Sequence, residues 1–491
     1  MLNELLAAAL YLGHPIPLTL MVIGTFSGIV VGAIPGLTGA MLITLSLPLT
    51  YFMEPKNAVI LLVSMYVGSI SGSLITATLL RIPGSPAAIM TTFDGYPMAQ
   101  RGQPSRALGL GITASFVGGL ISWIALVTLS KPLSVIGAKF GPWEIFALVM
   151  VALVLIASIS RGSFLKGMIA GMLGILLSMP GVDPAVGMPR LTFGFDQLNN
   201  GFQLLPVLIG VFAVSQVIQD ILGLDRQQER ICTASGGLWL KFADWRRHSW
   251  NMVRSSLIGT WVGILPGVGA SVGSIVAYSA AKNLSNEPEK FGSGAEEGIV
   301  ASEAANNATI GGALIPLIAL GIPGSIIDAI LIAALLLHSI QPGPLLFINN
   351  GDVVYAIIAT ALFANVAMFL MMSFSARYIS YLMLVPRFYL APIILILSIL
   401  GAFAVNNVVF DVWVMLGFGL LGFAMDRAGL PTGPFVIGFI LAPLAEEKLR
   451  TGLMMSGGSY APLYTNPVVS LLLLFAIAMV IVPIIKGLRR H

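Results

Sequence analysis

The sequence predicts an all-α polytopic membrane protein whose two halves are inverted structural repeats with broken or re-entrant helices. Of its 491 residues, 57% are hydrophobic and only 9% are charged, whereas a soluble domain carries about 25% charged residues. Several uncharged runs approach or exceed the roughly 20 residues that a helix needs to cross a membrane. Two glycine–proline motifs also recur, in the same order, in both halves of the chain.

The long uncharged runs predict the membrane-spanning segments. A helix satisfies its own backbone groups in lipid, so many such runs imply a helix bundle. A β-barrel would show short segments of alternating polarity instead. The runs cover residues 107–130, 198–219, 255–281, 304–327, 353–376 and 451–485.

The longest polar stretch divides the chain into two membrane parts. We expect a first membrane repeat over residues 1–222, a cytoplasmic or interfacial linker over 223–254, and a second membrane repeat over 255–491. Trp239, Trp245 and Trp250 lie among basic residues in this linker, which favours contact with membrane lipids. The net charge of +4 is spread over loop ends, so it indicates topology and predicts no nucleic-acid partner.

Several function classes lack their signatures in this sequence. No Gly-x-x-x-x-Gly-Lys-Ser/Thr loop occurs, so the chain itself is not expected to hydrolyse ATP. No His-Glu-x-x-His motif occurs, and the single cysteine, Cys232, excludes a disulfide framework or a cysteine-rich metal site. We therefore expect no enzyme, no resident cofactor and no metal beyond a transported or coupling ion.

An internal repeat relates the two halves. Gly32-Ala-Ile-Pro-Gly-Leu37 recurs as Gly263-Ile-Leu-Pro-Gly-Val268, an offset of 231 residues. Ile82-Pro-Gly-Ser85 recurs as Ile322-Pro-Gly-Ser325, an offset of 240 residues. Basic loops, which mark the cytoplasmic side, give the first half an odd number of crossings. The second copy then enters the membrane from the opposite face, as in many secondary transporters.

The Pro-Gly pairs predict a binding site. Proline removes a backbone donor and glycine permits unusual dihedral angles, so both interrupt helices. A helix interrupted inside the membrane exposes carbonyl groups that can hold a cation and N–H groups that can hold an anion. Such irregular backbone is tolerated there only where protein or a water-filled cavity lines it.

Several stretches carry a resemblance to a known family. They are 32–39, 79–86, 94–102, 288–292, 303–308, 321–325 and 340–344. In order and in composition they resemble the large membrane subunit of tripartite tricarboxylate transporters, over nearly the whole chain. Arg81 stands where sequences of this kind often have asparagine.

The resemblance implies a three-component system in the bacterial inner membrane. The expected partners are a small membrane subunit and a periplasmic solute-binding protein that delivers the substrate. The expected activity is uptake of a small organic carboxylate by cation symport with alternating access, with Na⁺ or H⁺ as the coupling ion and Na⁺ favoured.

The candidate substrate-binding residues lie at the second and fourth breaks and in the apolar stretch before the fourth. A guanidinium group can bind a carboxylate through two parallel hydrogen bonds. A charged side chain inside the membrane is energetically costly, so its presence indicates a function. Amides offer both donors and acceptors, and the family pattern favours the Asn306–Asn307 pair. The set is Arg81, Pro83, Gly84, Ser85, Asn306, Asn307, Pro323, Gly324 and Ser325.

The candidate cation-binding residues follow the first and third breaks and include one carboxylate. Carbonyl, hydroxyl and carboxylate oxygens suit a hard cation. The set is Pro35, Gly36, Thr38, Pro266, Gly267, Gly269, Ser271 and Asp328.

Structural roles for these residues remain open at this point. Arg81 and Asp328 can form an ion pair with each other, and the asparagines can form interhelical hydrogen bonds. The hydroxyl residues that follow the breaks can serve as helix caps. Asp94 is expected to anchor a loop or form a gate. A channel, or a permease subunit driven by a separate ATPase, is the alternative to a secondary transporter.

Overall fold

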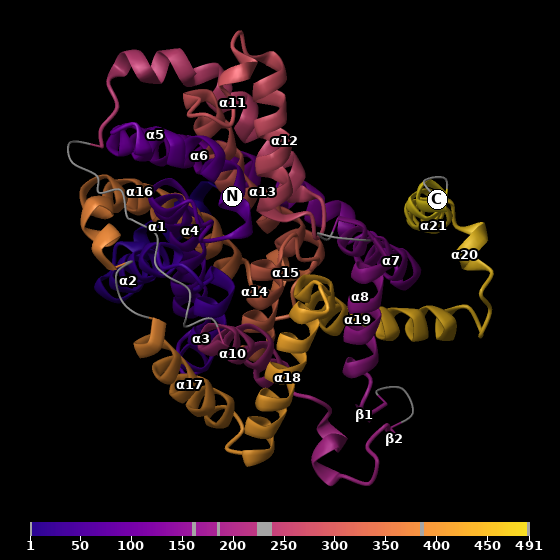
Figure 1. The fold of residues 1–491 in the computed structure, drawn as a ribbon. Coiled ribbons are helices and arrows are strands. Elements are labelled where there is room, and N and C mark those ends of the chain that lie inside the picture. Colours follow the sequence, from indigo (N-terminus) through magenta and orange to yellow (C-terminus); the bar gives the residue numbers. More distant parts are fainter. Residues whose placement is uncertain (1, 160–163, 184–186, 223–237, 383–386, 489–491) are drawn as a thin grey trace.

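The protein is almost entirely helical. The computed structural model describes residues 2–159, 164–183, 187–222, 238–382 and 387–488 (Figure 1). Two short strands, β1 (Gly181–Val182) and β2 (Pro189–Arg190), pair antiparallel. The helices of the first half are α1 (Leu2–Leu12), α2 (Pro15–Gly32), α3 (Gly39–Tyr51), α4 (Pro55–Leu80), η1 (Pro86–Ala88), α5 (Ile89–Gln100), α6 (Pro104–Gly137), α7 (Pro142–Ile159), α8 (Phe164–Ser178), η2 (Asp196–Asn200), α9 (Leu204–Ile209), the π-helical turn η3 (Gly210–Val214) and α10 (Ser215–Leu222).

The helices of the second half begin after residue 241. They are α11 (Phe242–Ile264), α12 (Gly269–Leu284), η4 (Pro288–Lys290), α13 (Glu296–Leu320), α14 (Ile326–Leu337), α15 (Leu346–Asn349), α16 (Gly351–Leu382), α17 (Arg387–Ala404), α18 (Val409–Arg427), α19 (Thr432–Met455), α20 (Pro462–Thr465) and α21 (Pro467–Leu488).

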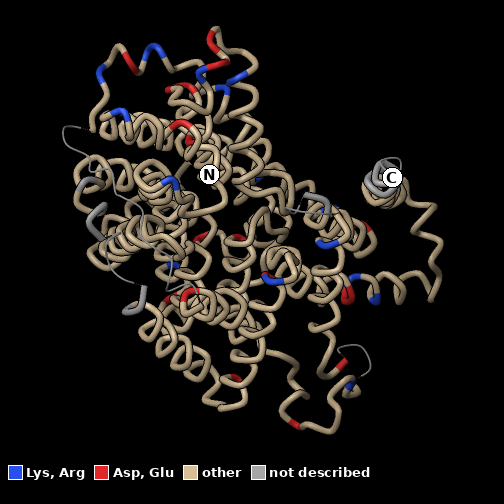
Figure 2. The backbone as a smooth tube through the Cα atoms, in the orientation of Figure 1, with Lys and Arg blue, Asp and Glu red and all other residues tan. Residues whose placement is uncertain are grey.

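The prediction of an all-α polytopic membrane protein is confirmed. Among the described residues, 6 helices are long and apolar enough to cross a membrane, and shorter apolar helices accompany them. Charged residues gather in the loops beside α11 to α13 and near β1, β2 and α19, while most of the helical body carries none (Figure 2). Three predicted runs, 255–281, 304–327 and 451–485, are each split by a break between helices.

The same helix packing is found in both copies of the repeat. Gly32 of α2 faces the backbone of α4, where an added Cβ would meet the Ser69 oxygen and lie 3.1 Å from the Ser73 nitrogen. Gly263 of α11 faces α13 in the same way, with an added Cβ 2.6 Å from the Thr309 oxygen. Only glycine allows such close contact between two helix backbones. The α2–α4 unit thus corresponds to the α11–α13 unit.

The two copies run in opposite directions. As the residue number increases along the first copy, the residue that it contacts in the second copy has a lower number. The Tyr66 hydroxyl lies 3.2 Å from Ser325 Oγ, and Ser71 Oγ donates to Asn307 Oδ1 at 2.6 Å. Further along the first copy, Asp94 contacts residues before Gly298. This antiparallel relation is the geometry that an inverted repeat requires.

Asp94 anchors α5 to the loop before α13. Its Oδ1 atom accepts hydrogen bonds from the backbone N–H groups of Gly292, Gly294 and Ala295, at 2.8, 2.9 and 2.8 Å. Its Oδ2 atom accepts from the Tyr278 hydroxyl at 2.8 Å. Since the side chain is fully buried, the carboxylate replaces water as the partner of these backbone donors. This geometry matches the predicted role of a loop anchor.

Part of the predicted linker belongs to α11. Residues 223–237 lie outside the described residues, while 242–254 form the first half of that helix. Asp244 Oδ2 accepts from the Lys241 N–H at 3.3 Å and begins the helix. Trp239 packs edge-on against Phe369 and Phe374 of α16, at ring distances of 5.5 and 5.7 Å, whereas Trp250 is largely exposed.

The core is centred on α4 and α13. Every residue of the most apolar part of α4 is buried, and α13 is buried from Gly298 to Ala319. The second motif of each pair, Ile82–Ser85 or Ile322–Ser325, follows the end of one of these helices. The core therefore holds the predicted breaks close to the centre of the molecule.

Candidate functional site

Four helix interruptions occur where the Pro-Gly motifs predict them. The first separates α2 from α3, and the second follows α4. The third separates α11 from α12, and the fourth separates α13 from α14. They cover residues 33–38, 81–85, 265–268 and 321–325.

All four interruptions meet at one cavity. Its volume is about 440 Å³, within the range of roughly 300–1,000 Å³ typical of small-molecule sites. Six predicted site residues line it: Thr38, Ser85, Gly267, Gly269, Ser271 and Ser325. Residues from both copies, far apart in sequence, therefore share one pocket.

The first turns of three helices border this cavity. The lining includes the opening residues of α3, α12 and α14. The first N–H groups of a helix have no partner within the helix, and the helix dipole places partial positive charge there. The cavity wall consequently combines hydroxyl groups with several positive helix ends, which favours an anionic ligand.

Two of the hydroxyl groups also cap these helices. Thr38 Oγ1 accepts from the Met41 N–H at 3.2 Å, and Ser325 Oγ accepts from the Asp328 N–H at 3.3 Å. The capping role that the sequence left open is thus present at α3 and α14. A serine or threonine oxygen has a second lone pair and a donor hydrogen, so each hydroxyl remains able to contact a ligand.

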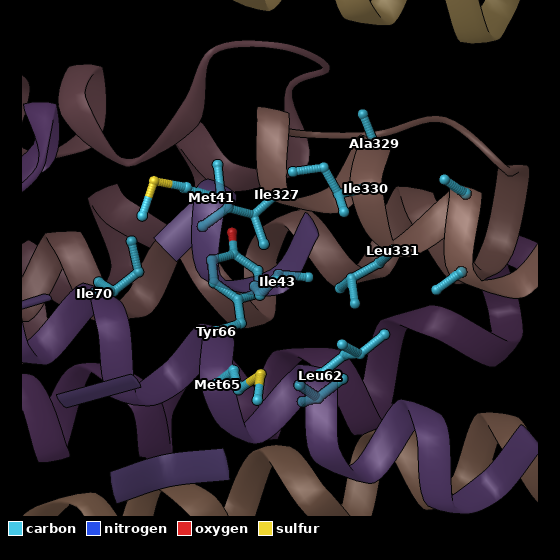
Figure 3. Close-up of a cluster of buried hydrophobic side chains, with 14 of the residues drawn as sticks. Met41, Ile43, Leu62, Met65, Tyr66, Ile70, Ile327, Ala329, Ile330 and Leu331 are labelled. Atoms are coloured by element: carbon cyan, nitrogen blue, oxygen red, sulfur yellow. The ribbon is translucent and has the colours of Figure 1, made fainter. Parts of the chain in front are cut away.

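Tyr66 connects the cavity to the core. Its ring lies among apolar side chains of α3, α4 and α14, including Met41, Ile70 and Ile327 (Figure 3). Its hydroxyl reaches Ser325 Oγ, and Tyr66 also lines the cavity. The packed ring holds this hydroxyl in place at the fourth break.

Arg81 and Asp328 do not form an ion pair. Arg81 is exposed, and its guanidinium carbon lies 6.0 Å from the centre of the Tyr96 ring. Asp328 is fully buried in the first turn of α14, and neither carboxylate oxygen has a hydrogen-bond partner among the described residues. The ion pair that the sequence left open is therefore absent, because the Arg81 side chain is exposed whereas the Asp328 side chain is buried. Neither residue lines the cavity.

The two asparagines lie in a buried polar layer outside the cavity. Asn307 accepts from Ser71 Oγ of α4 and donates to the Glu303 carbonyl oxygen at 3.3 Å. It thus makes the interhelical hydrogen bond that the sequence left open. Asn306 is fully buried, and both of its amide atoms lack a hydrogen-bond partner among the described residues.

The remaining predicted residues form the backbone of the breaks and do not line the cavity. An added Cβ on Gly324 would lie 2.9 Å from the Gly263 oxygen, and one on Gly84 would meet the Gly32 oxygen. These glycines let the two breaks within each copy pack against each other. Pro35, Gly36, Pro83, Pro266 and Pro323 lie in the same breaks, away from the lining.

Comparison with known proteins identifies the family. Residues 18–437 match the tripartite tricarboxylate transporter TctA family. This chain belongs to that family. It is therefore a multi-pass membrane transport protein, as the resemblance of the motifs implied.

Two relatives of this TctA-family protein come from Agrobacterium vitis. An uncharacterized 52.8 kDa protein in the TAR-I ttuC' 3' region is 32% identical over 476 residues, covering 97% of this chain and 94% of the relative. An uncharacterized protein in the TAR-II ttuC' 3' region is 34% identical over 232 residues, covering 47% of this chain and 96% of the relative. The transmembrane domain of a cyanobacterium bicarbonate transporter, BicA, aligns with 87% of this chain and 98% of its own, at 14% identity and a TM-score of 0.21.

The sequence did not reveal one wall of the cavity in this TctA-family protein. That wall comes from η3 and α10, with Gln216 and Gln219, and from Asp426 and Thr432 at the ends of α18 and α19. Gln219 Nε2 donates to Asp426 Oδ2 at 2.5 Å, so this hydrogen bond joins α10 to α18 at the wall. Two glutamines in an otherwise apolar run were the available signal, since π-helical turns often mark functional sites but leave no sequence pattern.

Proposed function

We propose that this chain is the large transmembrane subunit of a binding-protein-dependent secondary transporter that imports a small organic carboxylate by Na⁺ symport. It works in the bacterial inner membrane with a small membrane subunit and a periplasmic solute-binding protein. Membership of the TctA family supports the three-component assembly.

The meeting of three helix N-termini at one cavity is the observation that carries the carboxylate assignment. A carboxylate there accepts hydrogen bonds from free N–H groups of α3, α12 and α14 and from hydroxyls such as Ser85 and Ser271. These hydrogen bonds offset the cost of removing the anion from water, so the cavity lining needs no buried lysine or arginine.

The cation is assigned to the same interrupted backbone. Where α2 and α11 end, their last carbonyl groups lack partners within the helix. Oxygen ligands of this kind, together with Thr38 and Ser271, suit Na⁺. The positive charge of the cation and the negative charge of the solute stabilise each other in a cavity of low dielectric constant. Each ligand therefore raises the affinity for the other by the same factor.

Alternating access follows from the inverted repeat. The binding protein releases its solute into the cavity from the periplasmic side. One repeat-derived unit then moves against the other once solute and cation are both bound, and the cavity opens to the cytoplasm. Binding of only one ligand leaves an uncompensated charge in the site, which disfavours the transition.

Reconstitution tests this function. Proteoliposomes would contain this chain, its small partner and a cognate binding protein, and uptake of radiolabelled citrate, succinate and tartrate would be measured without ATP. We expect uptake that needs both the binding protein and an inward Na⁺ gradient. Uptake independent of both would indicate a channel, and uptake only with an added ATPase and ATP would indicate an ATP-driven permease.

A cavity-filling variant gives the matched comparison. Ser271→Trp places a large side chain in the cavity and should abolish uptake. Ser249→Trp places the same side chain at an exposed position of α11 and should leave uptake near the wild-type rate. Equal uptake by the two variants would exclude this cavity as the transport site.

A further inference from the structure

Glu303 is a buried carboxylate that the transport site does not use. It lies in the middle of α13, is fully buried, and does not line the cavity. Thr91 Oγ1 donates to Glu303 Oε1 at 2.5 Å, and Ser115 Oγ donates to Oε2 at 3.3 Å. Three helices, α5, α6 and α13, therefore supply an enclosed polar pocket around one carboxyl group.

No described cation neutralises this carboxylate. Several charged side chains on the surrounding elements are engaged elsewhere. Arg106 and His248 bind Glu296, Asp94 binds Tyr278 and backbone N–H groups, and Arg254 donates to Asn251. On α4, Lys56 is paired with Asp352, and the Tyr66 hydroxyl is hydrogen-bonded to Ser325. An ionised Glu303 would carry a buried charge without a cationic partner among the described residues, which is unfavourable.

The fold itself does not require an acid at this position. Helices α4 and α13 end at Leu80 and Leu320, an offset of 240 residues. The same offset relates Glu303 to Val63, which is 1% exposed in the first copy. An apolar side chain thus fills the equivalent place in the same architecture. A buried carboxylate that packing does not demand is a functional candidate.

The hydrogen-bonded geometry around Glu303 suits a proton better than a metal ion. Thr91 Oγ1 and Glu303 Oε1 are in direct hydrogen-bond contact, whereas a metal ion ligated by both would hold these oxygens further apart. The small void beside Asn307, of about 10 Å³, is not lined by Glu303 either. A proton is the one cation that needs no additional volume.

The hydroxyl groups suit both protonation states. Thr91 Oγ1 also lies 3.0 Å from Ser302 Oγ, and either oxygen can be the donor in that pair. With Glu303 ionised, Thr91 donates to the carboxylate. With Glu303 protonated, the carboxylic acid donates to Thr91 Oγ1, and the threonine hydrogen turns toward Ser302. One rotation of a hydroxyl therefore keeps every partner satisfied.

We propose that Glu303 is a proton-binding site of this transporter, separate from the substrate cavity. A proton from the outer solution forms an O–H bond with a carboxylate oxygen of Glu303. That bond breaks in the inward-facing state, and the proton leaves to the cytoplasm. The transport role rests on the proposed function, while the protonation of Glu303 can be measured without any substrate.

Infrared difference spectroscopy of the purified full-length protein tests protonation directly. The C=O stretching band of a protonated carboxylic acid should be present in the wild type at low pH and decline as the pH rises. The component of this band that comes from Glu303 should be missing from Glu303→Gln and retained in Glu297→Gln, a matched change on the same helix at a partly exposed site. A wild-type minus Glu303→Gln spectrum without such a band at any pH would overturn the proposal. Glu303→Asp, which should shift the band, covers the case in which the glutamine variant does not fold.

Transport measurements separate this proposal from the proposed function. In proteoliposomes with a pH-sensitive dye, wild-type uptake of citrate, succinate or tartrate should move protons, and Glu303→Gln should abolish proton movement. Na⁺-driven uptake without proton movement in the wild type would refute the transport role of Glu303 and leave the proposed function standing. Uptake under no gradient at all would refute the proposed function, and the infrared result would still decide whether Glu303 binds a proton.

Discussion

Arg81 combines a charged side chain with an unfavourable backbone conformation. It ends α4 with φ 58° and ψ 15°, in the left-handed region. Its counterpart in the second copy is Gly321, which ends α13 with φ 73° and ψ 23°. Glycine adopts this conformation without cost, whereas other residues lose roughly 1 kcal/mol. An arginine at this position therefore reduces stability, which favours a functional reason for its presence.

The Arg81→Asn variant tests the role of the arginine side chain separately from the cost of its backbone conformation. Asparagine tolerates the left-handed region, so the thermal stability of the purified variant should match or exceed that of the wild type. If the guanidinium group contacts the solute during entry, loss of a charged hydrogen bond of about 1.5–3 kcal/mol should raise the apparent KM about tenfold or more. Radiolabelled uptake measures this change. An unchanged KM would assign Arg81 to its contact with Tyr96 alone.

Asp94 is predicted to govern stability at the junction of the two copies. Asp94→Ala removes the acceptor of three backbone N–H groups. The Ala295 N–H is buried, and a buried donor without a partner costs about 1–3 kcal/mol. Asp94→Asn keeps one acceptor oxygen for the backbone N–H groups, but it loses the charge and replaces the oxygen that accepts from Tyr278 with an NH₂ donor. Melting temperatures in detergent should therefore fall in the order wild type, Asp94→Asn, Asp94→Ala. Equal melting temperatures for all three would show that the loop before α13 is held by other contacts.

At the scale of elements, small residues decide how the helices of each copy cross. Gly32 and Gly263 occupy equivalent crossings, and each faces the backbone of the neighbouring helix without space for a side chain. In lipid, such close packing is a main source of helix association. Each break follows the C-terminal end of one of these crossing helices, so the crossings decide what the breaks face.

Gly263→Ala tests this packing against a matched glycine. The added Cβ would lie 2.6 Å from the Thr309 oxygen, so α11 and α13 must separate. We expect destabilisation of about 1–3 kcal/mol, as for overpacked cores, measured as a lower melting temperature. Gly417→Ala in α18 meets no atom within 4 Å and should not lower it. A Gly263→Ala variant as stable as Gly417→Ala would contradict the packing assignment.

At the scale of the whole molecule, the cavity exists because two antiparallel copies meet. Neither copy alone supplies its lining, which also includes η3 and α10. Access to such a junction changes when the copies move relative to each other. The geometry therefore predicts a position that is reached from one side of the membrane at a time.

Cysteine labelling tests that expectation. Cys232 is the only cysteine, so Cys232→Ser with Ser271→Cys yields one thiol in the cavity. A membrane-impermeant maleimide should label it in both right-side-out and inside-out vesicles, and bound Na⁺ with solute should slow labelling. Ser249→Cys in the same background should be insensitive to the ligands. Labelling of Ser271→Cys from one side alone under all conditions would argue against alternating access.

The polytopic class, the repeat and the four breaks were predictable from the sequence. Apolar length, charge depletion and the placement of Pro-Gly pairs are local properties, and the membrane converts them directly into helices and interruptions. The chemistry of the individual site residues was less accessible. Thr38, Ser85, Ser271 and Ser325 line the cavity, whereas Arg81, Asn306 and Asp328 do not.

Only the tertiary structure decided which polar groups meet. The direction of a side chain at a break depends on how α2 crosses α4 and α11 crosses α13, and distance along the sequence carries no record of those crossings. The wall built by η3 and α10, the separation of Arg81 from Asp328, and the enclosure of Glu303 by Thr91 and Ser115 arise from long-range packing. By itself the sequence determined where the helices break, because proline and glycine act on their own backbone. The fold determined what those breaks face.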